Sequence, residues 1–333
     1  MWKSIRIWVS SVAIVGALWC GAASGQEVSI KVASGVTPPS MHNLYIHVAH
    51  EAGFFRKYGI RVTEFVQMRG GPLVTQAVVS GNIDVTATDP EGVLAAAVAG
   101  HPVRAVSAPG ERLSYMVAVR KEIASIADLR GKPFAVSRPG AISQYLMFPA
   151  LDKAGVPRDS IQWLSVGGGR ERMLALTADR VKGALLHLDY ALQAKEDPNI
   201  RFLGSLAESL PDFPFELLLV RKELIDRNPA AVTAITKAVI EACRYIVTNK
   251  EGTLKIFEKY AGQTDRKLTE AAYDALIAMR GFGVNGGMTR ENLTIAMMMA
   301  VENRQIERAV PLESWADFRF QDAALAELGR FGK

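Results

Sequence analysis

The sequence predicts an α/β protein built from two similar lobes, each with a mainly parallel sheet flanked by helices. Short runs rich in Val and Ile alternate with longer segments of helical periodicity, and the chain carries a weak internal repeat. With 333 residues and 49% hydrophobic content, the chain also supplies enough apolar surface for two cores.

Seven short apolar runs are the expected strands, and helical segments fall between most of them. Beyond residue 224 the chain becomes strongly helical. The sequence DRNP at residues 226–229 opens a helix, because proline is tolerated in the first turn, and this helix is expected to continue to Lys250. The expected strands are residues 29–33, 61–67, 85–88, 103–107, 133–137, 161–166 and 184–188.

The internal repeat is the main argument for two lobes. Residues 77–89 (AVVSGNIDVTATD) align without gaps on residues 175–187 (ALTADRVKGALLH), and the same offset places Gly70-Gly71 on Gly168-Gly169. The identities are few, but three turn regions recur in the same order. This recurrence predicts two similar α/β units.

A second pair of similar segments indicates where the chain passes between the lobes. Residues 115–123 (YMVAVRKEI) resemble residues 216–224 (ELLLVRKEL), and both are typical of extended crossings. The first lobe is therefore expected to consist of residues 26–116 and 218–333, and the second lobe of residues 117–217.

Residues 1–25 have the pattern of a secretory signal peptide. Lys3 and Arg6 precede an apolar run at residues 7–20, and small residues follow at 23–25. The apolar run is too short to cross a bilayer, which takes about 20 residues, and Trp19 before Cys20 disfavours lipid modification. Cleavage would leave Cys243 as the only cysteine, so no intramolecular disulfide is expected.

The charge of the mature chain argues against a nucleic-acid partner. Without Lys3 and Arg6, the number of Lys and Arg residues falls from 39 to 37, against 34 Asp and Glu, which leaves a net charge of about +3. This charge is small and dispersed along the sequence, unlike a nucleic-acid-binding surface.

The candidate ligand-binding residues lie where the expected strands end. In open parallel sheets, the ligand binds beyond the carboxyl ends of the strands. The candidates of the first lobe are Thr37, His42, Arg69, Gly70, Thr88 and Asp89. The candidates of the second lobe are Ser137, Arg138, Gly140, Ser143, Gly168, Arg170 and His187.

Several of these residues are typical of anion binding. Ser137, Gly140 and Ser143 open a helix, whose free N–H groups and dipole favour a carboxylate, sulfonate or phosphate, although the serines could simply cap the helix. The arginines could add bidentate contacts or be solvated surface residues. Asp89 and Glu91 could instead receive an amino group or a cationic ring, or cap the following helix.

No motif indicates a metal, a cofactor or an enzyme. His42, His47 and His50 lack the spacing of a zinc site, and we interpret His42 and His187 as candidate ligand contacts instead. The sequence GFGVNG at residues 281–286 fits GxGxxG, but it follows an expected helix rather than a strand, which indicates a helix stop and a loop. We therefore expect no cofactor, no metal and no catalytic activity.

Four segments together resemble the periplasmic solute-binding proteins of bacterial ABC importers. The resemblance is to the branch that binds nitrate, taurine, alkanesulfonates, aromatic carboxylates and thiamine-precursor pyrimidines. It covers nearly all of the mature chain, although Lys182 stands where the repeat and many relatives have Asp, the counterpart of Asp84. The segments are residues 44–62, 77–85, 123–136 and 221–235, and VPLESWADFRF at residues 310–320 extends the likeness.

This resemblance implies a type II periplasmic binding protein fold and a function. The two lobes would close by hinge motion on a small organic anion, and an ABC permease at the inner membrane would receive it from a monomeric, periplasmic protein. Ser137, Gly140 and Ser143, with Arg170, would hold the anion opposite Thr37, His42 and Asp89. The alternatives are a pyrimidine- or thiamine-precursor-related protein or enzyme on the same scaffold, and a receptor for a signalling partner.

Overall fold

The strands of the protein form two five-stranded sheets with equivalent strand orders in a computed structural model that describes residues 27–262 and 264–332. The expected signal peptide, residues 1–25, lies outside the described residues. The first sheet has the order β2 (Ile60–Gln67), β1 (Val28–Ser34), β3 (Val85–Thr88), β10 (Glu216–Arg221) and β4 (Val103–Gly110). The second has the order β7 (Gln162–Ser165), β6 (Pro133–Val136), β8 (Gly183–His187), β5 (Tyr115–Arg120) and β9 (Ile200–Ser205).

Each sheet contains one strand that runs against the others. In the first sheet, β10 pairs antiparallel with β3 and β4, and in the second sheet β5 pairs antiparallel with β8 and β9. The chain passes from the first sheet to the second between β4 and β5 and returns between β9 and β10. The antiparallel strands β5 and β10 therefore each begin just after a crossing. The predicted α/β fold of two similar halves is confirmed. The lobe boundaries at residues 116/117 and 217/218 stay a prediction.

Both sheets have an equivalent hydrogen bond and ion pair at the carboxyl ends of β5 and β10. Arg221 N donates to Asp84 O at 3.1 Å, and in the other half Arg120 N donates to Lys182 O at 3.0 Å. Asp84 forms an ion pair with Arg221 at 2.6 Å, whereas Lys182 pairs with Glu122 at 2.8 Å. The exchange of Asp for Lys therefore keeps an ion pair at this position with the charges reversed.

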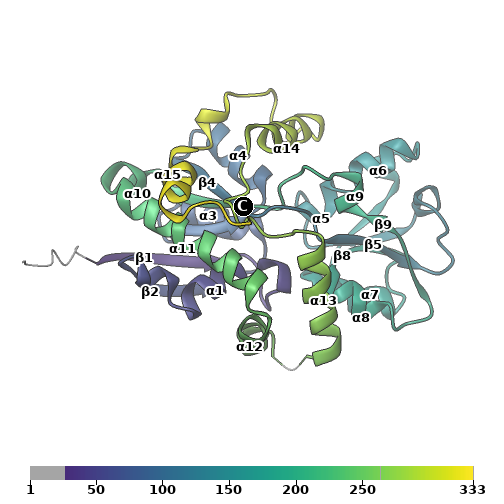
Figure 1. The fold of residues 1–333 in the computed structure, drawn as a ribbon. Helices are drawn as coiled ribbons and strands as arrows, with labels where there is room; N and C mark the ends of the chain where they lie inside the picture. Colours follow the sequence, from purple (N-terminus) through teal and green to yellow (C-terminus); the bar gives the residue numbers. More distant parts are fainter. Residues whose placement is uncertain (1–26, 263, 333) are drawn as a thin grey trace, which may run out of the picture.

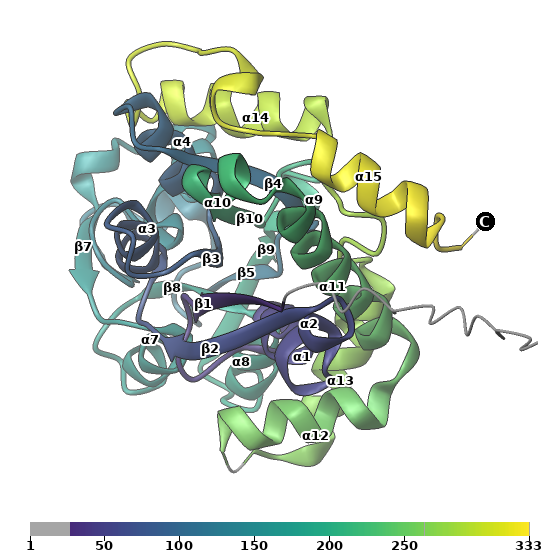
Figure 2. The same ribbon diagram turned by 90° about the vertical axis from the view of Figure 1, so that its left-hand side faces the viewer.

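Helices cover both faces of each sheet (Figures 1 and 2). In the first part of the chain they are η1 (Met41–Asn43), α1 (Tyr45–Glu51), α2 (Phe54–Lys57), α3 (Gly71–Val79) and α4 (Pro90–Val98). Between β5 and β10 they are η2 (Ile126–Leu129), α5 (Ile142–Tyr145), α6 (Phe148–Lys153), η3 (Arg158–Ser160), α7 (Gly169–Thr177), α8 (Leu188–Ala194) and α9 (Leu206–Ser209). After β10 follow α10 (Lys222–Arg227), α11 (Pro229–Thr248), α12 (Lys250–Ala261), α13 (Arg266–Ala278), α14 (Arg290–Glu302), η4 (Leu312–Ser314) and α15 (Arg319–Leu328).

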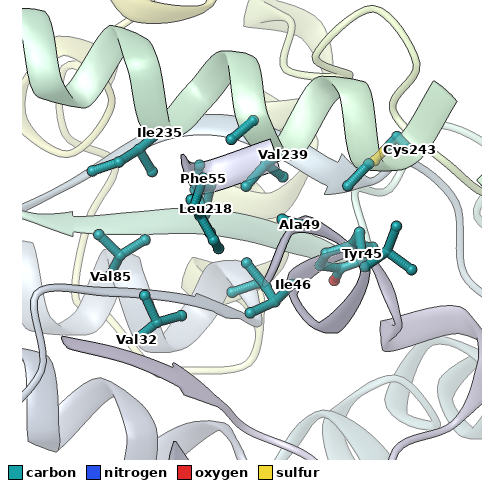
Figure 3. Close-up of a cluster of buried hydrophobic side chains, with 14 of the residues drawn as sticks. Val32, Tyr45, Ile46, Ala49, Phe55, Val85, Leu218, Ile235, Val239 and Cys243 are labelled. Carbon is teal, nitrogen blue, oxygen red and sulfur yellow. The ribbon is translucent and has the colours of Figure 1, made fainter. Parts of the chain in front are cut away.

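The long helix α11 forms much of the core beside the first sheet. It begins as predicted, with Pro229 in its first turn and the Asn228 side chain accepting a hydrogen bond from Ala231 N at 3.0 Å. Ile235, Val239 and Cys243 lie four residues apart and therefore project from one face of the helix toward the sheet (Figure 3). Their burial fixes the helix on the sheet.

The helices after β10 contact both sheets. In α14, Leu293 and Met297 belong to a hydrophobic cluster of the first sheet, whereas Ala296 and Met299 belong to a cluster of the second. Helix α13 packs along α8, beside the second sheet (Figure 1). GFGVNG, residues 281–286, follows α13 as a loop, as expected, and Gly286 O accepts a hydrogen bond from Ala108 N at 2.6 Å. Among the described residues, no helix is long and apolar enough to cross a membrane.

Candidate ligand-binding site

A cavity of about 150 Å³ lies between the two sheets, where the carboxyl ends of β1, β3, β6 and β8 face one another. Residues at the start of β5 and β10, just after the chain crosses between the sheets, also line it. The strands of the first sheet and the segments next to them contribute Gly35, Val36, Thr37, Pro38, Arg69, Gly70, Gly71, Pro72, Ala87, Thr88, Asp89, Phe215 and Glu216. The strands of the second sheet and the segments next to them contribute Tyr115, Ser137, Arg138, Ala141, Ile142, Gly167, Gly168, Gly169, Arg170, Glu171, Arg172, His187 and Tyr190.

Most of the residues chosen from the sequence line this cavity, although their roles toward a ligand stay predictions. His42, Gly140 and Ser143 are the three candidates that do not line it. The ten candidates in the wall are Thr37, Arg69, Gly70, Thr88, Asp89, Ser137, Arg138, Gly168, Arg170 and His187.

His42 lies in the layer behind the cavity wall. Its side chain is buried, and its ring packs on Phe215 and Phe282, with centroid distances of 4.2 and 5.9 Å. Neither ring nitrogen has a hydrogen-bond partner, and burial lowers the pKa of His42 to about 3. His42 is therefore neutral and supports Phe215 from behind.

The N–H groups of the serine cluster already have partners within the protein. Ser137 N donates to Ser143 Oγ at 2.9 Å, and the two serine hydroxyl oxygens lie 3.0 Å apart. Gly140 N donates to Gln144 Oε1 at 2.7 Å. These two N–H groups are therefore not free donors, and neither serine caps α5, whose N-cap position is Ala141 without a side-chain cap.

Two longer helices do begin at the cavity without a side-chain cap. Gly70 precedes α3 and Gly168 precedes α7, at positions related by the internal repeat, and neither helix start is capped by a side chain. A Cβ atom on Gly169 would lie 2.6 Å from the Tyr190 ring, so the close approach here requires glycine. Free N–H groups and the helix dipole make both helix starts favourable for an anion.

Arg172 is a cavity residue that the sequence reasoning missed. It is 2% exposed, and its Nε and Nη1 donate to Leu185 O at 3.1 Å and to Gly167 O at 2.9 Å. Burial lowers the pKa of Arg172, but a guanidinium stays charged in proteins. Within residues 27–262 and 264–332 no carboxylate forms an ion pair with it, although the nearby Glu171 charge raises its pKa. The cavity wall thus carries a buried positive charge that no carboxylate contacts directly.

The three predicted arginines lie nearer the surface. Arg69 and Arg170 are exposed, and Arg138 is half-buried. Arg138 Nη2 donates to Arg69 O at 2.8 Å, and Arg69 Nη1 lies 3.7 Å from Glu171 Oε1. These residues form the rim of the cavity between the two halves of the chain.

The acidic groups near the cavity are hydrogen-bonded inside the protein. Asp89 Oδ1 accepts a hydrogen bond from Gly92 N at 2.9 Å and so caps α4, one of the alternatives considered for it, while burial raises its pKa. Glu216 accepts a hydrogen bond from Asn43 Nδ2 at 2.8 Å and is also bonded to the Tyr45 hydroxyl. Burial raises the pKa of Glu216 to about 8, so this carboxyl is mostly protonated at neutral pH.

An aromatic cluster forms the inner part of the wall. The rings of Tyr115 and His187 are stacked with their centroids 4.2 Å apart, and Phe215 meets them edge-on at 5.8 and 5.6 Å. His187 Nδ1 lies 3.3 Å from Ser114 Oγ. Burial and the nearby Arg172 charge hold the pKa of His187 well below its ordinary value, so the imidazole is neutral.

Several contacts hold the two halves together around the cavity. The Tyr145 hydroxyl of α5 donates to Glu91 Oε2 of α4, and both residues are buried. Met41 N donates to Asp189 Oδ2 at 3.4 Å. Together with the bond between Arg138 and Arg69, these contacts make this a closed arrangement.

A metal site is not evident in the described part of the chain. No group of three or more His, Cys, Asp and Glu residues there is arranged to hold a metal ion. The cavity therefore offers a guanidinium, hydroxyl groups, two helix starts and aromatic rings, which suits binding of a small anion.

Solved structures share this fold at low sequence identity. A protein from Bordetella bronchiseptica RB50 has a TM-score of 0.79 and 20% identity, covering 90% of this chain and 98% of that chain. The periplasmic aliphatic sulphonate binding protein SsuA from Escherichia coli has a TM-score of 0.68 and 18% identity, covering 86% and 91%. The periplasmic nitrate-binding protein NrtA from Synechocystis PCC 6803 has a TM-score of 0.71 and 15% identity, covering 91% and 90%. The fold is that of the two-lobed periplasmic binding proteins.

The sequence itself defines the family. Residues 41–252, more than half of the chain, match the NMT1/THI5-like family, and the chain belongs to that family. A sequence comparison with curated proteins finds no match. The resemblance seen in the sequence is thus confirmed for the fold and the family.

Proposed function

We propose that this protein is the extracytoplasmic substrate-binding component of an ABC importer, and that it captures a small organic anion in the cavity between its lobes. The family match supports this function, as does the fold shared with SsuA and NrtA, which are named as sulphonate- and nitrate-binding periplasmic proteins. The lobes would be residues 26–116 with 218–333, and residues 117–217.

The observation that carries the proposal is the buried charge of Arg172, whose hydrogen bonds go to two carbonyl groups and not to a carboxylate. Burying a charge is costly, and an anionic ligand in direct contact with it would reduce that cost. The uncapped starts of α3 and α7 lie on opposite sides of the cavity and would add N–H groups from both lobes. The hydroxyl groups of Thr37, Thr88 and Ser137 would orient the ligand.

Binding would favour the closed arrangement. A ligand that touches both lobes binds the closed form better than the open form, and the population shifts accordingly. The contact between Tyr145 and Glu91 exists only when the lobes meet, so it would stabilise the closed, loaded form. A permease at the inner membrane would then receive the ligand from a periplasmic monomer exported by residues 1–25. No covalent step is needed.

Two measurements test this function. Native mass spectrometry of freshly purified protein should detect a bound organic anion. Isothermal titration of protein that has been unfolded, washed and refolded should detect binding from a panel of carboxylates, sulfonates and nitrogen heterocycles. The proposal fails if the refolded protein regains its native circular dichroism spectrum and binds no anion of the panel, or binds only cationic or uncharged members.

A further inference from the structure

The volume of the cavity matches one small ring or its equivalent. Its volume is about 150 Å³. An apolar cavity of about this volume in another protein holds one benzene molecule. An inorganic ion such as nitrate would leave most of the cavity unfilled, and a molecule with two fused rings would exceed it.

The inner wall is suited to a flat apolar surface. Tyr115, His187 and Phe215 already pack on one another in stacked and edge-on geometry, and Tyr190 lines the cavity beside them. Aromatic rings gain more from such contacts with another ring than from contact with an aliphatic group of similar area. The walls therefore favour an aromatic ligand over an aliphatic one.

The anion-binding group lies next to this aromatic cluster. Arg172, Tyr115 and His187 line the same cavity, and Arg172 Nε donates to Leu185 O at 3.1 Å, two residues before His187 on β8. An anion bound to Arg172 would therefore have the rest of its molecule among the rings.

The charges of the wall suit a simple anion rather than a zwitterion. An ammonium group would need a free carboxylate, but Asp89 caps α4 and Glu171 lies 3.7 Å from Arg69. Glu216 is bonded to Asn43 and to the Tyr45 hydroxyl. Each acidic group of the wall thus has a partner within the protein.

We infer that the ligand is a planar monoanion with a single aromatic ring, of the size and charge of benzoate. This inference rests on the proposed function and narrows it to one chemical class. The carboxylate, or an equivalent acidic group, binds Arg172, and the ring packs among Tyr115, Phe215 and Tyr190.

The test compares ligands that differ in one property each, with the refolded wild-type protein and isothermal titration. Cyclohexanecarboxylate has the same charge and ring size as benzoate without the aromatic character, and we expect it to bind about 2- to 13-fold more weakly. Benzamide lacks the charge, and 2-naphthoate is too large, so neither should bind measurably at concentrations that saturate with benzoate.

Variants then locate the ring. Phe215→Leu should reduce the ratio of benzoate affinity to cyclohexanecarboxylate affinity, whereas Phe257→Leu, a buried control in the first core, should leave the ratio unchanged. If Phe215→Leu does not fold, Tyr190→Leu gives the same readout. The ratio is compared within one variant, so a general loss of stability does not affect it.

The outcomes separate this inference from the proposed function. If cyclohexanecarboxylate or an alkanesulfonate binds as tightly as benzoate, the aromatic class is wrong and the anion-binding function stands. If benzamide binds as tightly as benzoate, the inference that the ligand carries a negative charge is wrong. If no anion of the wider panel binds, the proposed function itself fails.

Discussion

The contact between Tyr145 and Glu91 gives the sharpest test of lobe closure. Tyr145 belongs to α5 and Glu91 to α4, so their hydrogen bond joins the two halves of the chain. Both side chains are buried, and Glu91 Oε1 has no other partner. Burial and the nearby Asp89 charge raise the pKa of Glu91 well above its ordinary value.

Replacing Tyr145 by Phe removes the hydroxyl and leaves the Glu91 carboxyl buried without a partner in the closed form. An unsatisfied buried polar group costs about 1–3 kcal/mol. In the open form both groups would reach water, so the cost falls on the closed form alone. Since the ligand must drive closure, its affinity should fall by roughly 5- to 150-fold.

The assay is isothermal titration with the ligand identified by the panel, and small-angle X-ray scattering reports closure. Tyr273→Phe is the matched control, because the Tyr273 hydroxyl is also buried but bonds to Ile246 O, at 2.5 Å, within the helices that follow β10. The control should lower the free energy of unfolding and leave the affinity unchanged. Equal affinities of Tyr145→Phe and wild type would show that ligand binding does not bring these lobes together.

Three further changes probe the cavity. Arg172→Met should weaken anion binding by about 30- to 5000-fold, since removing one partner of a buried charge pair costs about 2–5 kcal/mol. The exposed control Arg180→Met should leave anion binding unchanged. Equal titration curves for Arg172→Met and wild type would contradict the assignment of Arg172 to the binding site. Asp89→Asn keeps the cap of α4 and removes a negative charge, so anion affinity should rise, and a fall would point to a cationic group on the ligand. Glu216 has an ordinary pKa near 4.5 when unfolded and about 8 when folded, so the folded state binds more protons between these values and stability should fall as pH rises through them. Thermal unfolding of Glu216→Gln should show a smaller fall, by up to roughly 1.4 kcal/mol per pH unit, and parallel curves would refute the assignment.

The sequence predicted the regular part of the fold because strands in parallel sheets are apolar on both faces. Six of the seven expected strands match a strand of the structure within one residue at each end, and β4 extends three residues further, to Gly110. The strand β9 was not expected, because its residues are exposed or only partly buried at the sheet edge and carry no strong apolar pattern.

The sequence predicted most of the loop residues of the candidate site but missed the buried residues of its inner wall. The rule that ligands bind beyond the carboxyl ends of parallel strands led to ten residues of the wall. Tyr115, Phe215 and Glu216 lie at the start of antiparallel strands, where that rule does not apply. Arg170 and Arg172 are equivalent in the sequence RER, and only the direction of α7 shows that Arg172 is buried while Arg170 is exposed.

The most direct test of the central claim is a crystal structure of the protein with saturating benzoate. We expect the carboxylate within hydrogen-bonding distance of Arg172 and the ring beside Tyr115 and Phe215, with the two lobes closed as described. A benzoate bound elsewhere on the protein, or a closed cavity whose anion does not contact Arg172, would contradict the account.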